Sequence, residues 1–197
     1  MSALALFAAG LIVVPSGTQE LATEVTRAAP SGGKSSAVLV EVSVNPEGKA
    51  YRCEPLHVTG DEAFGPLACR SHRRWRLAEP KDADGLPTFG VFRSIAVYSF
   101  GPSLPRELQG LKHAPDITLS LDVDNGISVS DFVINAAISQ EGRVTHCEGK
   151  GETPEALVAA ACEATLQRDW DVLLNAENQP VSHVRMVVIH AEKTPAS

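Results

Sequence analysis

Residues 38–54 read VLVEVSVNPEGKAYRCE, and residues 132–148 read FVINAAISQEGRVTHCE. The two stretches align without a gap, and the alignment continues after the loss of one residue in the following loop. The matched positions include the turn glycines and all four cysteines: Gly48 with Gly142, Cys53 with Cys147, Cys69 with Cys162, and later Pro87 with Pro180. An internal repeat of this kind indicates that the chain contains one structural unit twice.

The length of 197 residues fits two small modules of about 65 residues each. We expect module 1 at 37–100 and module 2 at 116–193, with a linker at 101–115 whose Pro and Gly residues break regular structure. Residues 15–36 are poor in large apolar groups and end in Gly and Ser, which predicts a flexible tether.

Hydrophobic alternation predicts the strands of each module. Val38, Val40, Val42 and Val44 alternate with other residues, which is typical of a strand with one buried face. The other inward positions are Phe132, Ile134, Ala136 and Ile138, and the last strands are expected at Val91–Phe100 and Val184–His190. A leading hairpin is expected in module 2, with alternation from Ile117 to Val123 and a turn at Asn125-Gly126.

Each module is expected to place one helix after its returning strand. In the first copy Thr59 and Glu62 have the spacing of a capping box. In the second copy Thr153 is the predicted N-cap, with Pro154 in the first helical position. The fold class is therefore α+β, with two tandem modules, each an antiparallel sheet packed on one helix.

The four cysteines form one pair per repeat, with separations of 16 and 15 positions. We predict disulfides joining Cys53 to Cys69 and Cys147 to Cys162, because small modules often need such cross-links. The alternative is four buried free thiols. Metal binding is disfavoured, because the chain has no Cys-x-x-Cys or His-x-x-x-His spacing.

Residues 3–14 form an uncharged apolar run of 12 residues. This is the length of a signal-peptide core and is too short to cross a bilayer, so we predict a signal peptide or short apolar anchor at residues 1–14. The alternative is a short interfacial or buried helix. Disulfides and export together favour an oxidising compartment.

The net charge of −7 argues against sequence-independent nucleic-acid binding. Residues 36–100 contain 8 Lys+Arg and 8 Asp+Glu, whereas residues 130–193 contain 5 and 10. The two copies therefore share a framework but not a surface.

No catalytic motif is present, and the six histidines are scattered without ligand or triad spacing. Asp122 and Asp124 share a strand face, but their place beside the Asn-Gly turn favours solvated side chains. The sharpest charge cluster is RSHRRWR at residues 70–76, which is expected to complement a helix C-terminus, with an acidic partner or phosphate surface as the alternative. We therefore predict a protein that is not an enzyme and has no cofactor.

The order of these elements resembles the TonB C-terminal domain family. The resemblance is closest in VSVNPEGKAYRC, LACRSHRRWRL and DADGLP. In these stretches the chain is similar to disulfide-bearing TonB-like proteins of some Gram-negative bacteria. It covers residues 38–100 well. The second copy is more divergent, because it lacks the Arg-rich exit and has Asn178 where the first has Gly85.

The resemblance implies a periplasmic protein that pairs, by strand addition, with an extended segment of an outer-membrane TonB-dependent receptor or another envelope protein. Its role would be energy transduction for transport, or an accessory role. The last strand of each copy is the expected free edge, with the partner-binding residues Val184, Arg185, Met186, Val187 and Val188. Membrane contact is expected at most through residues 3–14. The alternative is a structural or inhibitory envelope protein whose edge is capped internally by the 117–123 hairpin.

Overall fold

The computed structural model describes residues 35–74, 77–98, 113–121 and 130–193. Two helices and seven strands follow one another in this part of the chain, so the fold is α+β. In chain order they are β1 (Ser36–Val44), β2 (Ala50–Thr59), α2 (Phe64–His72), β3 (Phe89–Tyr98), β4 (Ile117–Leu121), β5 (Ser130–Ile138), β6 (Val144–Gly149), α3 (Glu155–Leu166) and β7 (His183–Lys193).

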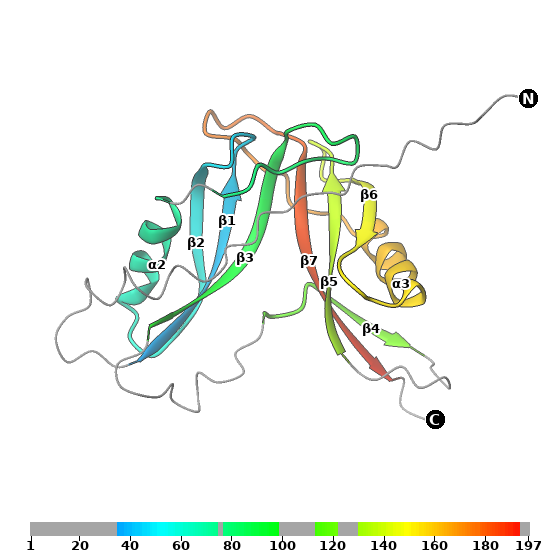
Figure 1. The fold of residues 1–197 in the computed structure, drawn as a ribbon, viewed down its shortest axis with the longest axis horizontal. Coiled ribbons are helices and arrows are strands. Elements are labelled where there is room, and N and C mark those ends of the chain that lie inside the picture. The colour runs from blue at the N-terminus through cyan, green and yellow to red at the C-terminus, as the bar shows by residue number, and fades with distance from the viewer. Residues whose placement is uncertain (1–34, 75–76, 99–112, 122–129, 194–197) are drawn as a thin grey trace, which may run out of the picture.

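The strands form one mixed sheet in the order β2-β1-β3-β7-β5-β6, with β4 paired to β7 as a seventh strand. β1 is antiparallel to β2 and β3, and β5 is antiparallel to β6 and β7. We call β1–β3 with α2 the amino-terminal half, and β4–β7 with α3 the carboxy-terminal half. Figure 1 shows α2 and α3 at the two outer ends of this sheet, beside β2 and β6.

The two halves meet through parallel pairing of β3 with β7 over Phe89–Val91 and His183–Arg185. Beyond this short contact the two strands diverge (Figure 1). The expected pair of separate antiparallel sheets is thus replaced by one continuous sheet of mixed direction. The sequence alternation could not predict this pairing, because it reports which face of a strand is buried but not which strand lies beside it.

The two helices pack on opposite faces of the sheet. Val44 is paired with Gly90, Gly90 with Val184, and Val184 with Ala137, and residues paired in register point to the same face. Ala137 and Val184 accordingly join the hydrophobic cluster beneath α2. The neighbouring positions on β5 and β7 join the second cluster, beneath α3: Ile134, Ala136, Ile138, Val187 and Ile189.

The predicted inward positions of the first strand are confirmed, because Val38, Val40, Val42 and Val44 are all 0% exposed. Each buried side chain of this size stabilises the fold by roughly 1.5–3 kcal/mol. On β5, Ile134, Ala136 and Ile138 are buried as expected, and Phe132 is partly buried.

Glycines at positive φ close the turn between the first two strands of each half. Gly48 has φ 75° and Gly142 has φ 82°. The carbonyl oxygen of Gly48 accepts a hydrogen bond from the Leu77 N–H (2.9 Å), and that of Gly142 accepts one from the Trp170 N–H (3.1 Å). Leu77 and Trp170 occupy matched positions of the repeat. A Cβ at either glycine would lie 2.3 or 2.2 Å from the carbonyl oxygen of Leu77 or Trp170, so only glycine fits.

A second turn is also duplicated, with the same hydrogen bonds in each half. The Asp82 Oδ1 accepts from two backbone N–H groups, and the Asn175 Oδ1 accepts from the two matched ones. Gly85 has φ 77°, and its counterpart Asn178 has φ 60°. Asparagine is one of the few other residues that tolerate this left-handed conformation. The apparent departure from the repeat at Asn178 therefore preserves the backbone.

Both predicted helix starts lie too early, by four residues for α2 and by one for α3. α2 begins at Phe64 with Ala63 as N-cap, and Thr59 ends β2 instead of capping the helix. A turn lies between them, in which the Ser36 Oγ accepts from the Asp61 N–H. α3 begins at Glu155, one residue later than predicted, and the Thr153 hydroxyl donates to the Lys150 carbonyl.

The predicted hairpin of the carboxy-terminal half is also wrong. β4 pairs with β7 in parallel, at Ile117–Leu121 against Ile189–Lys193, and β5 pairs with β7 in antiparallel fashion. No pairing joins β4 to β5 among the described residues. Several predictions lie outside those residues: the apolar run 3–14, the tether up to residue 34, positions 75–76 of the charge cluster 70–76, most of the linker 101–115, and the 122–129 turn region with Asp122 and Asp124.

Candidate functional site

Both predicted disulfides are present. Cys53 in β2 is bonded to Cys69 in α2, with Cα atoms 5.3 Å apart, and Cys147 in β6 is bonded to Cys162 in α3, with Cα atoms 5.6 Å apart. Each bond ties the outermost strand of its half to the helix that covers it. Two such bonds suggest an oxidising, extracytoplasmic environment.

The predicted partner-binding strand is not an edge. Val184 to Val188 lie in β7, which pairs with β5 along one side over His183–Ala191. On the other side β7 pairs first with β3 and then with β4. The last strand of the amino-terminal half, β3, pairs with β1 over Gly90–Tyr98 and with β7 only over Phe89–Val91, so among the described residues 92–98 keep one side without a strand partner. The proposed edge at residues 184–188 is therefore wrong, because these residues lie in the interior of the sheet.

Asp116 covers the part of β7 that lies between β3 and β4. Its backbone N–H donates to the Val188 carbonyl (2.8 Å), and its Oδ2 accepts from the Val188 N–H (2.9 Å). Its Oδ1 lies 2.8 Å from the Arg93 Nη2. One residue thus takes the place of a strand partner and links the two halves.

A cluster of charges lies at the same junction. The Glu41 Oε2 lies 2.7 Å from the Arg185 Nη2 and 3.4 Å from the Arg93 Nε. Both arginine side chains are only 14% exposed. The two guanidinium groups and the two carboxylates of Glu41 and Asp116 balance in charge, so this cluster holds the halves together without leaving excess charge for a ligand.

A polar cavity of about 400 Å³ lies against this cluster, between the open face of the amino-terminal half and residues 171–173. His183 lines it and is 2% exposed. Burial lowers the pKa of His183 to about 4; a backbone hydrogen bond to Val181 opposes this shift, and the charge of Arg185 adds to it. The imidazole is therefore neutral at pH 7.

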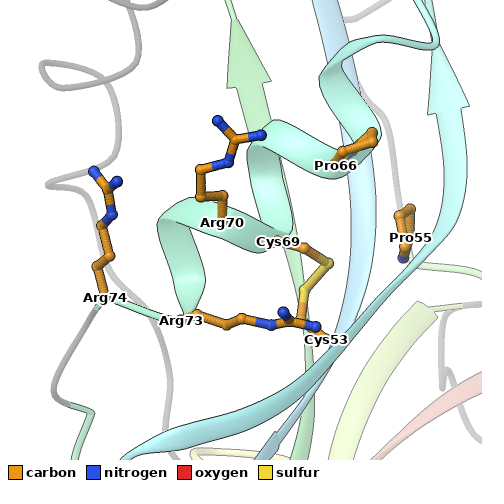
Figure 2. A pocket seen from close by; sticks show the side chains of 7 residues that line it. All are labelled: Cys53, Pro55, Pro66, Cys69, Arg70, Arg73 and Arg74. Carbon is orange, nitrogen blue, oxygen red and sulfur yellow. A yellow bond between two sulfur atoms is a disulfide. The ribbon is translucent and has the colours of Figure 1, made fainter.

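The second cavity, which we call the arginine groove, lies between β2 and α2 and has a volume of about 540 Å³. Its apolar part is the Cys53–Cys69 disulfide with two prolines, and its rim has three guanidinium groups. The lining residues are Cys53, Pro55, Pro66, Cys69, Arg70, Arg73 and Arg74. Figure 2 shows Arg70 and Arg74 pointing outward from the helical segment, whereas Arg73 extends toward Cys53 in this view.

The three arginines are exposed and available to a ligand. Arg70 is in the last turn of α2, Arg73 caps the helix, and Arg74 follows it. In the part of the chain that the structure describes, none of these three side chains forms an ion pair or hydrogen bond. The sequence had singled out this cluster, but it gave no indication that a groove beside the disulfide would lie next to it.

The corresponding positions of α3 have different chemistry. Arg70, Arg73 and Arg74 align with Glu163, Leu166 and Gln167, and the last turn of α3 contains no basic residue. The helix and strand also approach closely in both halves. In the carboxy-terminal half Gly149, the counterpart of Pro55, faces the Val158 side chain, whereas in the amino-terminal half Gly65 lies against Pro55.

The remaining titratable side chains do not assemble into a recognisable catalytic or metal site. His190 Nδ1 lies 2.6 Å from Asp131 Oδ1 at the surface, and His72 is buried with its Nδ1 2.8 Å from the Ala68 carbonyl. Across the described ranges, no group of three or more His, Cys, Asp or Glu side chains is placed to hold a metal ion. Neither of the two described helices is long and apolar enough to span a membrane.

Comparisons with protein-family models, with curated proteins and with solved structures found no match for this chain.

Proposed function

We propose that this chain is a periplasmic, non-enzymatic protein of TonB type, built from two related modules, that binds an extended segment of an outer-membrane receptor or another envelope protein. Its role is energy transduction for transport across the outer membrane, or an accessory role in it. The duplicated turns at Gly48 and Gly142, with the matched disulfides, support the two-module interpretation.

The observation that supports strand addition is the free edge of β2. Among the described residues this ten-residue strand pairs only with β1, which leaves one side of its backbone without a strand partner. Arg52 and residues 54–57 of this strand are exposed, and Cys53 between them is buried. Unpaired N–H and C=O groups on such an edge are a template for another extended chain.

β6, the matched strand at the other end of the sheet path, is a poorer template. It has six residues, against ten in β2, and its flank carries Glu163 where the β2 flank carries Arg70. β2 has its own restriction, because Pro55 has no N–H and removes one donor. We therefore place the added segment along β2, with the interruption at Pro55.

Site-specific photocrosslinking tests this proposal with a matched control. A benzoylphenylalanine replaces Leu56 on β2 in one variant and Lys150, the aligned position after β6, in the other. With an outer-membrane extract of a Gram-negative bacterium, we expect the Leu56 variant to crosslink to one short extended segment of a receptor, identified by mass spectrometry. Equal crosslinking from Lys150, or crosslinks spread over unrelated proteins, would contradict the proposal.

A structural or inhibitory envelope protein is the second candidate, and the covering of β7 by β3, Asp116 and β4 favours it. Hydrogen exchange separates the two candidates. In a binding protein, the β2 amides on the side away from β1 exchange rapidly in the free state and slowly with its partner. A structural protein with covered edges has slow exchange in β2 under both conditions.

A further inference from the structure

The arginine groove has more arginines than stabilisation of the α2 C-terminus requires. A cation near a helix C-terminus contributes typically 0.3–1 kcal/mol when exposed, so one arginine there is expected on stability grounds. However, α3 ends in the same framework with no basic residue in its last turn. Three exposed arginines around a groove, in a chain of net charge −7, therefore need another explanation.

The geometry of β2 connects the groove to the free edge. Cys53 and Pro55 line the arginine groove, whereas the alternate residues Arg52, Glu54 and Leu56 line the polar cavity on the other face. A segment added beside β2 would direct its own alternate side chains to the same two faces. Every second side chain of the bound segment would then lie near the arginines.

The spacing of the arginines fits two successive inward side chains of such a segment. Residues at i and i+2 of a strand are about 6.5–7 Å apart. Side chains three positions apart on a helix have Cβ atoms about 5–6 Å apart, and Arg73 at the α2 C-cap still has helical backbone angles relative to Arg70. Two carboxylates at i and i+2 could therefore each reach a guanidinium group, which pairs well with a carboxylate.

We propose that the segment bound along β2 is acidic, with Asp or Glu at positions i and i+2 facing Arg70, Arg73 and Arg74. This inference rests on the proposed function and adds to it the chemistry of the partner. A second copy of this chain and an anionic membrane surface are the other occupants that the charge would admit. The net charge of −7 disfavours the membrane surface, since the rest of the protein would be repelled.

The test uses the whole chain and fluorescein-labelled ten-residue peptides of alternating Val and Thr. Two positions at i and i+2 are Glu, Ser or Lys in three versions, and binding is measured by fluorescence anisotropy. The variant Arg70→Gln/Arg73→Gln/Arg74→Gln removes the three positive charges from the rim of the groove. Arg143→Gln is the control, because Arg143 is an exposed arginine at the turn of the other half. Thermal unfolding and intact disulfides verify that each variant folds.

We expect the Glu peptide to bind about tenfold more tightly than the Lys peptide, because the exposed arginines attract the two carboxylates and repel the two ammonium groups. The triple variant should lose about tenfold in affinity for the Glu peptide and change little for the Ser peptide. The control should bind all three peptides as the unmodified chain does. Hydrogen exchange should show protection in β2 and none in β6.

Several outcomes would overturn the inference alone: equal affinity for the Glu and Ser peptides, an equal loss for all peptides in the triple variant, or protection at β6. So would displacement of the Glu peptide by phosphatidylglycerol vesicles but not by phosphatidylcholine vesicles, or self-association of the chain that depends on the arginines. If no peptide of any charge binds, strand addition itself is refuted, and the inference fails with it.

Discussion

The two halves of the molecule share their backbone turns and differ in the surface beside their outer strands. Gly48 and Gly142 accept matched hydrogen bonds, and a disulfide joins strand to helix in each half. By contrast, the end of α2 has three arginines where α3 has Glu163, Leu166 and Gln167. A few backbone positions therefore fix the framework, and the residues around the groove are free to differ.

The junction between the halves shows the same contrast across the two sheet faces. On the α3 face, Glu41 contacts Arg93 and Arg185. The aligned residues on the α2 face are Asn135, Met186 and Phe92. Phe92 belongs to the cluster beneath α2, and Met186 packs against it. One face of the junction is thus joined by charges and the other largely by apolar contacts.

Removing each disulfide is the strongest test of the equivalence of the halves. Cys53→Ala/Cys69→Ala and Cys147→Ala/Cys162→Ala should each lower the free energy of unfolding by about 3 kcal/mol, because the loops they close have separations of 16 and 15 residues. Urea unfolding under non-reducing conditions measures both. A loss confined to one pair would show that the halves are not equivalent in stability.

Low pH should lower the stability of the carboxy-terminal half through His183. The amino-terminal half has no histidine at the matched position, which is Gly90. The pKa of His183 is lowered to about 4, so the unfolded chain binds more protons below about pH 6.5 and stability falls with pH. From pH 7 to pH 5 we expect a loss of about 2 kcal/mol from this residue.

The variant His183→Gln should remove that part of the pH dependence in urea unfolding. Burial also lowers the pKa of His72, so part of the acid sensitivity should persist in the variant. An unchanged pH profile in His183→Gln would show that the buried imidazole is not the cause.

Neutralising Glu41 tests the charged face of the junction. Glu41→Gln leaves Arg185 without its carboxylate partner and leaves Arg93 with Asp116, so we expect a loss of about 1–2 kcal/mol. Glu54→Gln is the control on the neighbouring strand, because Glu54 and Arg52 are each 60% exposed. The control should stay within about 0.5 kcal/mol. Equal effects in urea unfolding would contradict a structural role for Glu41.

The smallest effect is expected at Gly85 and Asn178. Replacing either residue with Ala should lower the free energy of unfolding by about 1 kcal/mol, because alanine disfavours positive φ. Asn178→Gly should be close to neutral. A Cβ at Gly85 meets no atom within 4 Å, so the cost there reports the backbone alone. If Gly85→Ala were as stable as the unmodified chain in thermal unfolding while Asn178→Ala were not, the two turns would not be equivalent.

Local features were predictable from the sequence, and long-range pairings were not. The alternating valines, the turn glycines and both cysteine pairs each have a signal within one repeat, and the structure contains all of them. The pairing of β3 with β7 joins strands that are far apart in the chain, and no residue in either strand specifies its neighbour. The expected edge at residues 184–188 therefore lies inside the sheet, whereas β3 beyond Val91 keeps an unpaired side among the described residues.

Part of the candidate site was also visible in the sequence. The run of arginines after Cys69 stood out, but its exposure and its place beside Pro55 depend on how α2 crosses β2. Glu41 and Asp116 gave no comparable signal, because single charges at outward or loop positions are common. Their partners, Arg93 and Arg185, come together only because the sheet is continuous.

The disulfides also determine how the sheet responds to mechanical load. Outer strands are usually the first to fray, since only one side of their backbone is held. Here the outermost strand of each half is bonded covalently to a helix through its cysteine. Pulling on a segment attached to β2 would therefore transmit tension to α2 as well as to β1, and the strand would resist peeling away alone.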